Sequence, residues 1–159
     1  MAATAHLVAR NFAYHIEKTS PTAEATARQW RENPRPFVLS DDLSSGTERS
    51  FTIRPIRSLR LDAVTDGYAR YSDWMFELEI AYTSNRSLVS LTDIMAQDAH
   101  DLVKLLRMDS SFTGYSAAQP TTDIGLIDRE FEGQEFVLLG ETTALLRQAW
   151  RVKIKEVEQ

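Results

Sequence analysis

The sequence predicts an α+β fold, in which a mostly antiparallel sheet carries one long helix packed on it and an N-terminal helical segment. Residues 74–82 and 150–154 alternate apolar and charged side chains, which is typical of strands that bury one face. Their exposed positions are acidic in the first segment and basic in the second, as is common for neighbours in an antiparallel sheet. Residues 90–108 instead place apolar side chains at helical spacing, which predicts the long helix.

The N-terminal segment is predicted to hold two helices. Residues 5–18 have apolar side chains at helical spacing, so one side of this helix should face a core. Pro21 ends it, and residues 22–32 form a second, alanine-rich helix. Pro34 stops the second helix, because proline has no N–H and disfavours helical geometry in the residue before it.

Two strands are predicted to follow these helices. Residues 37–39 are typical of a short strand, residues 41–47 of a turn, and residues 50–56 of the next strand. Pro55 cannot donate to a strand ladder, which places it at a sheet edge or at a strand end.

A long arm-like loop is predicted for residues 57–73. The segment has no clean period, and it exceeds the roughly 12–15 residues beyond which an unstructured connection is uncommon. Its tyrosine and arginine side chains are typical of interfaces, where they contribute large contact area. The alternative is a mobile hairpin whose tyrosines face solvent. The candidate oligomer-interface residues are Arg57, Arg60, Tyr68, Arg70 and Tyr71.

The C-terminal half is predicted to hold the long helix, 90–108, and the remaining strands. Residues 123–131 and 135–139 form two strands around a turn at 132–134. Residues 140–147 are a linker of ambiguous structure before the closing strand.

Composition limits the classes of function. With 159 residues, 43% of them apolar and 26% charged, the chain has the size and composition of one globular domain, residues 1–159. The absence of cysteine removes disulfides, thiolate zinc sites and a cysteine nucleophile. A net charge of −5 argues against a role that depends on neutralising phosphates. We expect neither a secretory signal peptide nor a membrane span, which needs ~20 apolar residues.

Candidate chemistry is sparse along the chain. Asp98, His100 and Asp101 are metal-ligating types, but their spacing on one helix turns them to different sides, so we expect a solvated helix face. Glu77 and Glu79 share one strand face, and the basic residues of the last strand are their expected partners. No glycine-rich phosphate loop or nucleophile elbow is present. We therefore expect no catalytic, cofactor or metal site and no enzymatic activity.

The predicted segments follow a characteristic order: an N-terminal helix, two strands, an arm-like connection, an alternating strand, a helix and a closing strand. The residues that carry this layout are Arg35-Pro36-Phe37, Ser50-Phe51-Thr52-Ile53-Arg54-Pro55, Trp74-Met75-Phe76-Glu77-Leu78-Glu79-Ile80-Ala81-Tyr82, Asp98 and Trp150-Arg151-Val152-Lys153-Ile154. In order and in hydrophobic pattern, the chain resembles the tail terminator proteins of long-tailed bacteriophages. The resemblance covers most of the chain.

The resemblance implies a structural subunit of a virion. Such a subunit closes into a homo-oligomeric ring, typically of six copies, at the head-proximal end of the tail tube. It ends polymerisation of the tail tube protein and presents a surface to the head connector or stopper protein. DNA passes through the ring without being bound specifically, and surplus carboxylates would repel its phosphates. The implied location is the virion neck, with host cytoplasm before assembly and no membrane contact.

Two alternatives remain open from the sequence. Another neck component, such as a head-closure or tail-completion protein, shares the small size and the sheet-plus-helix composition. A small cytoplasmic ligand-binding or enzymatic α+β domain belongs to a different functional class.

Overall fold

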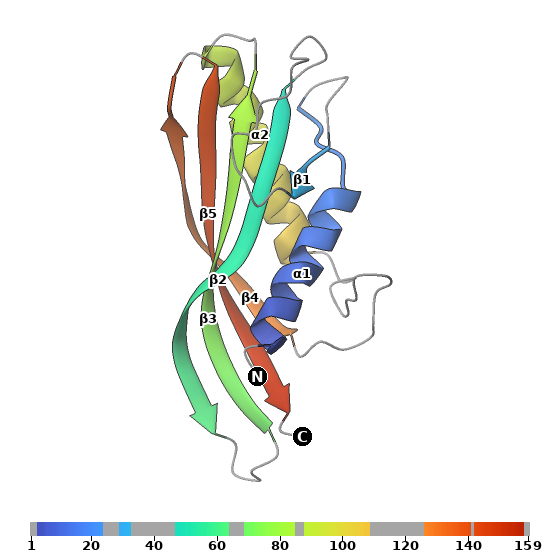
Figure 1. The fold of residues 1–159 in the computed structure, drawn as a ribbon, viewed down its shortest axis with the longest axis vertical. Helices are drawn as coiled ribbons and strands as arrows, with labels where there is room; N and C mark the ends of the chain where they lie inside the picture. Colours follow the sequence, from blue (N-terminus) through green and yellow to red (C-terminus); the bar gives the residue numbers. More distant parts are fainter. Residues whose placement is uncertain are drawn as a thin grey trace.

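The computed structural model describes residues 3–23, 29–32, 47–63, 69–84, 88–108, 126–140 and 142–157. This part of the chain forms two helices and a five-stranded, mostly antiparallel sheet, which confirms the predicted α+β class (Figure 1). In chain order the elements are α1 (Ala3–Lys18), β1 (Arg31–Glu32), β2 (Glu48–Ala63), β3 (Ala69–Thr83), α2 (Leu88–Met108), β4 (Leu126–Leu138) and β5 (Thr143–Val157).

The strands follow the spatial order β1-β2-β3-β5-β4. β1 pairs in parallel with β2, whereas β2 with β3, β3 with β5 and β5 with β4 pair antiparallel. The two alternating segments of the sequence lie in β3 and β5 as direct neighbours, with Phe76 opposite Trp150. The predicted pairing of the acidic and the basic segment is therefore confirmed.

Both helices share one buried cluster of apolar side chains with one face of the sheet. Phe12 of α1 meets Phe76 of β3 edge to face, with ring centroids 5.7 Å apart. Leu102 of α2 and Trp150 of β5 belong to the same cluster and are fully buried. Removing each such side chain from water contributes about 1.5–3 kcal/mol. We call this the core face of the sheet and the opposite side its outer face.

The predicted helices at 5–18 and 90–108 are confirmed as α1 and α2. Their apolar stripes are the sides that are buried, including Val8 and Ile16 in α1 and Leu91 in α2. Neither described helix is long and apolar enough to cross a membrane.

The prediction of a second helix over 22–32 is wrong at its end. Arg31 and Glu32 form the short strand β1, and Trp30 before them is buried. Arg31 and Glu32 lie beside Ser50 and Phe51 of β2, so pairing with the sheet outweighs the local helical pattern. The rest of this region, residues 24–28, and the predicted strand and turn at 37–39 and 41–46 lie outside the described residues.

The arm-like loop predicted at 57–73 is instead the far half of a long hairpin. β2 continues to Ala63 and β3 begins at Ala69, and the two strands stay paired throughout. This part of the sheet, together with the end of β5, extends past the helices (Figure 1). Residues 64–68 lie outside the described residues. The alternation was hidden because β2 has register shifts between Pro55 and Arg57 and between Ser58 and Arg60, which interrupt the period of two. Pro55 lies inside β2 and not at a strand end. No described strand borders β2 at this position, so the edge alternative is confirmed, and the first register shift follows directly after it.

The turn predicted at 132–134 is also wrong. β4 runs unbroken from Leu126 to Leu138, with a register shift between Phe131 and Gly133. Gly133 has φ +153°, a backbone conformation that side chains with a Cβ rarely adopt, so glycine here makes a bulge and not a turn. The predicted linker at 140–147 is shorter, because β5 begins at Thr143.

Candidate assembly surface

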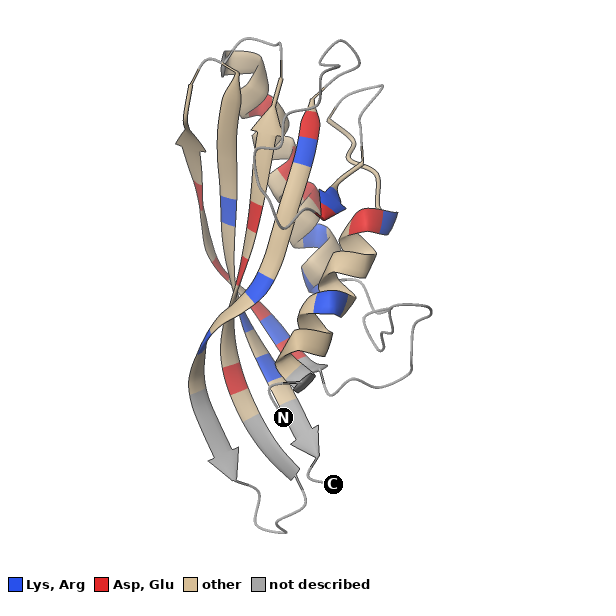
Figure 2. Ribbon diagram, in the orientation of Figure 1, with Lys and Arg blue, Asp and Glu red and all other residues tan. Residues whose placement is uncertain are grey.

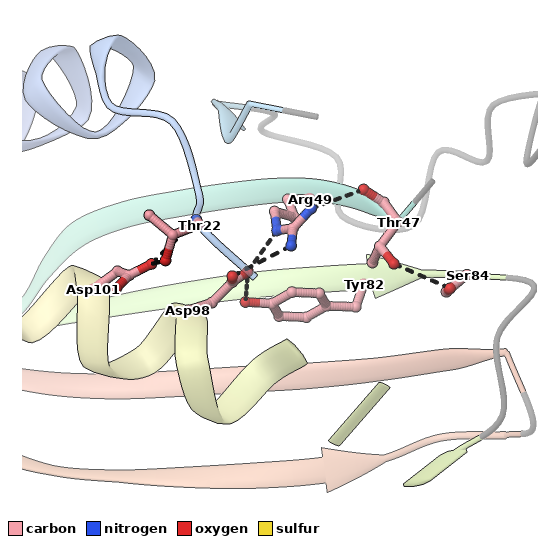
Figure 3. A network of polar contacts seen from close by, with 7 residues as sticks. All are labelled: Thr22, Thr47, Arg49, Tyr82, Ser84, Asp98 and Asp101. Atoms are coloured by element: carbon pink, nitrogen blue, oxygen red, sulfur yellow. Dashed lines mark hydrogen bonds and ion pairs between the residues drawn. The ribbon is translucent and has the colours of Figure 1, made fainter. Parts of the chain in front are cut away.

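A charged cluster lies inside the domain, between α2 and the core face of the sheet (Figure 3). Arg49 of β2 donates from Nε to Oδ2 of Asp98 at 2.5 Å and from Nη2 to Oδ1 at 3.3 Å. Tyr82 of β3 donates its hydroxyl to Oδ2 of Asp98 at 2.9 Å. Arg49 also donates from Nη1 to the carbonyl oxygen of Thr47 at 3.2 Å. The side chains of Arg49 and Asp98 are fully buried.

This cluster fixes one turn of α2 to β2 and β3. Burial raises the pKa of the Asp98 carboxyl, and the hydrogen bonds and charge of Arg49 together with the Tyr82 hydroxyl offset part of that rise. Burial and the nearby Asp98 raise the pKa of Tyr82 well above its ordinary value. Two side chains of the sheet therefore hold the Asp98 carboxylate, and the cluster positions the helix.

The expected solvated helix face is wrong for Asp98 and fits His100, which is exposed. Asp101 instead accepts hydrogen bonds from the Thr22 hydroxyl at 2.7 Å and from Gln97 at 2.9 Å. Three metal-ligating side chains do not meet anywhere in the described residues. Asp98 was missed because a lone carboxylate at the border of an apolar stripe has no partner nearby in sequence; Arg49 lies 49 residues away.

The outer face of the sheet carries its charges in rows that follow the strands. β3 presents an acidic row and its neighbour β5 presents a basic row. Arg147 of β5 donates to Glu79 of β3 at 2.7 Å, and Arg151 donates to Asp73 at 3.0 Å. The hydrogen bond with Glu79 is the main cause of a raised pKa for Arg147. The residues are Asp73, Glu77 and Glu79 on β3 and Arg147, Arg151 and Lys153 on β5.

The rows on the two flanking strands continue this alternation. β4 is acidic: Glu135 accepts from Arg147 at 3.2 Å, and Asp128 and Glu130 lie opposite Lys153 and Arg151. β2 is basic beyond its first residues, with Arg54 opposite Glu77 and Arg57 opposite Met75; both arginines are exposed. From β2 to β3, β5 and β4 the rows are thus basic, acidic, basic and acidic (Figure 2).

The bulges bring these side chains into line. In an unbroken strand Arg54 and Arg57 would point to opposite faces, because their spacing is odd. The shift after Pro55 restores both to positions opposite outer-face residues of β3. The bulge at Gly133 does the same for Glu130 and Glu135, which lie opposite Arg151 and Arg147.

Four of the five predicted interface residues lie in the described part of the far half of the hairpin. Arg57 is exposed on the basic row of β2, and Arg60 is paired in the strand register with Asp73. Arg70 and Tyr71 belong to the first residues of β3, opposite Glu156 and Lys155. Tyr68 lies outside the described residues. The region is therefore an ordered hairpin in its described part, and its role as an interface stays a prediction.

The predicted ion pairs between β3 and β5 form in a different register. Arg151, Lys153 and Lys155 were the expected partners of Glu77 and Glu79. Glu79 instead pairs with Arg147, a residue assigned by the sequence to a linker, and Arg151 pairs with Asp73. The neighbouring strands were thus identified correctly, and the alignment between them was not.

No family model and no curated protein sequence matches the chain. Among solved structures, the chain is similar to one chain of a structure described as the virion of a native gene transfer agent (GTA) particle. The TM-score is 0.54 at 10% sequence identity, over 98% of this chain and 100% of the other. At this identity the likeness concerns the fold, so this chain shares the fold of a component of a virion particle.

Proposed function

We propose that this protein is a structural component of a phage-like virion, and within it the tail terminator. In this role, six copies of the chain form a ring that ends growth of the tail tube and joins the tail to the head. The partners are other copies, the tail tube protein and the head connector or stopper. DNA passes through the ring without specific binding, and the role needs neither catalysis nor a cofactor.

The observation that carries this proposal is the full-length similarity to a chain of the GTA virion. The two chains correspond over nearly their whole lengths, so the likeness is not that of one shared supersecondary unit. It agrees with the resemblance to tail terminators, which rests on the order of the segments and on the hydrophobic pattern of the sequence and not on the fold. The sheet also suits assembly, because its outer face carries alternating basic and acidic rows that continue to both of its edges.

Another neck component, such as a head-closure or tail-completion protein, is the second candidate. The same similarity supports it, since the likeness is to a chain of a virion particle and does not identify a position within it. A ligand-binding or enzymatic domain receives less support from the described residues. The charged hollow lined by Asp73, Asp128, Glu130, Arg151 and Lys153 lies on the sheet surface, and its arginine and one aspartate are already paired with each other.

Electron microscopy of the protein mixed with tail tubes of its own particle tests the terminator role. We expect density at one end of each tube and an arrest of further elongation when tube protein is added. Binding at neither end, or elongation at an unchanged rate, would reject the terminator role. Binding to purified head connectors alone would favour the head-closure alternative.

A further inference from the structure

We propose that copies of this chain join edge to edge, with the β4 edge of one copy against the β2 edge of the next, so that the sheet continues from subunit to subunit. The partner is a second copy of the same chain. This inference deepens the proposed function, on which its biological role rests, by naming the surface through which the ring closes.

Two edges of the described sheet are available for such a contact. β4 is a terminal strand over its whole length, Leu126–Leu138. At the other side β1 covers β2 only at Ser50 and Phe51, and Arg10 donates to the carbonyl oxygen of Ile53. From Arg54 onward, the edge of β2 that faces away from β3 has no described strand beside it. Unpaired edges of this length are templates for strand pairing with another chain.

Charge decides which edge fits which. Two β4 edges would place acidic rows together, and two β2 edges would place basic rows together; both arrangements are repulsive. A β4 edge beside a β2 edge instead sets the acidic row of β4, which includes Asp128 and Glu130, beside the basic row of β2, which includes Arg54 and Arg57. The sequence of basic, acidic, basic and acidic rows then repeats without a break around the assembly. Such a contact joins two different surfaces, and contacts of this type form rings when the rotation between neighbours closes.

Strand direction satisfies the same arrangement. β2, β3, β5 and β4 alternate in direction, and their number is even. A rotation about a ring axis preserves direction along that axis, so β2 of the next copy runs antiparallel to β4. The continued sheet therefore keeps both its alternation of charge and its alternation of direction.

The residues of the two edges also lie at matching heights. The register aligns Glu130, Arg151, Met75 and Arg57 in one line across the sheet. Asp128 lies in the line that ends at Arg60. A rotation with little slip along the strands brings Glu130 beside Arg57 of the neighbour. Pro55 has no N–H, so a ladder on this edge of β2 lacks one donor at that position.

Apolar side chains at the edges add area to this contact. Ile56 of β2 is 46% exposed, and Phe136 and Leu138 of β4 are 40% and 52% exposed. Phe136 lies opposite Leu146, which is fully buried, so it stands on the core face where the described layer of helices leaves it uncovered. Phe136 and Leu138 lie in the lines that end at Phe51 and Arg49, so the end of the neighbour's sheet that carries β1 would cover them. Removal of this surface from water favours association.

A charge-exchange experiment tests the proposal. One variant carries Arg54→Glu and Arg57→Glu; a second carries Asp128→Lys and Glu130→Lys. Wild-type protein should sediment as a closed oligomer, and each variant alone should associate more than about tenfold more weakly, because like charges meet at every contact. An equimolar mixture should recover the wild-type mass, since alternating copies restore opposite charges at each contact. Lys18→Glu with Lys104→Glu is the control for a change of charge away from both edges and should assemble normally.

The mixture is the decisive sample. A wild-type protein that stays monomeric at its highest soluble concentration would overturn the proposal, as would variants that assemble normally or a mixture that stays dissociated. Circular dichroism and the thermal midpoint of each variant verify that it is folded. If the mixture recovers the oligomer but wild-type rings do not bind tail tubes, the interface stands and the terminator role fails. If tubes are capped but the variants cap them equally well, the function stands and the interface fails.

Cysteine trapping gives an independent readout, because the natural chain contains no cysteine. Arg57 and Glu130 are separated within one copy by three strand spacings, roughly 14 Å, which no disulfide can span. A chain with both Arg57→Cys and Glu130→Cys should therefore form only links between copies, seen under denaturing conditions as a ladder that ends at the ring size. Each single variant should give no ladder. Absence of a ladder from an oligomer of normal mass would place the contact elsewhere.

Discussion

Ion pairs on the two faces of this sheet use the same chemistry in opposite surroundings. On the core face, Arg49 and Asp98 are fully buried and share a hydrogen-bond network with Tyr82. On the outer face, Arg147 pairs with Glu79 and Glu135 while its side chain is 40% exposed. The inner pair holds a helix in place. The outer pairs leave charge in solvent, where another molecule can meet it.

The difference shows how little ion-pair geometry alone says about energetics. The Nε–Oδ2 distance in the inner pair and the Nε–Oε2 distance in the outer pair are similar, 2.5 and 2.7 Å. Loss of one buried partner leaves a charge without solvent, whereas loss of an exposed partner leaves a charge that water can hydrate. We therefore expect changes on the core face to act on folding and changes on the outer face to act on association.

Arg49→Met should produce the largest effect. It leaves the Asp98 carboxylate buried without its guanidinium, which costs about 3–5 kcal/mol of unfolding free energy. Chemical denaturation monitored by circular dichroism measures this loss. The double variant Arg49→Met with Asp98→Leu removes both charges and should recover most of the stability. A double variant as unstable as the single one would mean that the pair contributes by packing and not by charge.

The loss caused by Arg49→Met should depend on pH. Because the pKa of Asp98 is already raised in the folded protein, the folded state holds a proton more readily than the unfolded state, and stability falls as pH rises through that window. Removal of Arg49 takes away its hydrogen bonds and charge, which lower the pKa of Asp98, while the Tyr82 hydroxyl remains, so the window extends upward. The difference in unfolding free energy between variant and wild type should therefore shrink as pH falls towards the ordinary carboxyl pKa. Asp98→Asn in the Arg49→Met background should abolish the dependence, and a difference that is constant with pH would contradict this account.

Gly133→Ala should have an intermediate effect, because it acts on the backbone that arranges the outer face. A Cβ at Gly133 meets no atom within 4 Å, so the cost comes from φ +153° and not from crowding. Such strain costs about 1–3 kcal/mol. Denaturation measures the loss, and Gly140→Ala is the matched control outside the bulge, with only an ordinary contact to Thr143 and a small expected change. Equal effects at the two glycines would show that the bulge conformation is not strained for alanine.

The same bulges explain how much of the molecule the sequence could reveal. Long regular patterns were sufficient for α1, α2 and the pairing of β3 with β5, because burial of one side imposes a period that survives in the sequence. The far half of the β2–β3 hairpin and the middle of β4 were mistaken for a loop and a turn, because each bulge adds a residue and reverses the alternation. Gly133 was taken as a turn residue when its role is to permit a bulge.

The candidate surface was only partly accessible to sequence reasoning. Arg57 was identified from composition, yet its alignment with Arg54 depends on a register shift that no local pattern discloses. The partner of Glu79 was missed because Arg147 lies 68 residues away and the strand alignment fixes the pair. Opposite charge on neighbouring strands could be predicted; which side chains meet could not, since register follows from bulges and from the packing of the core.

Disruption of the outer network should have a small effect on folding. Glu79→Gln or Arg147→Gln should each lower the unfolding free energy by less than about 1 kcal/mol, because water hydrates the remaining charge. A double-mutant cycle over the two positions measures their coupling. That coupling should decrease further in 1 M salt, where the screening length falls to about 3 Å. A coupling as large as that between Arg49 and Asp98 would remove the distinction between the two faces.

A similarly small effect on folding is expected from Arg54→Glu with Arg57→Glu, although this change should have the greatest effect on association. Both side chains are exposed, and the one cross-strand charge pair that is replaced is that of Arg54 with Glu77, so the unfolding free energy should fall by no more than about 1 kcal/mol. Denaturation at a concentration where wild type is dissociated measures folding alone; sedimentation at high concentration measures assembly. Arg49→Met should show the reverse order of effects. The double arginine variant could also unfold as readily as Arg49→Met. Its failure to assemble would then reflect loss of the fold, and the basic row would stabilise the domain instead of contacting a neighbour.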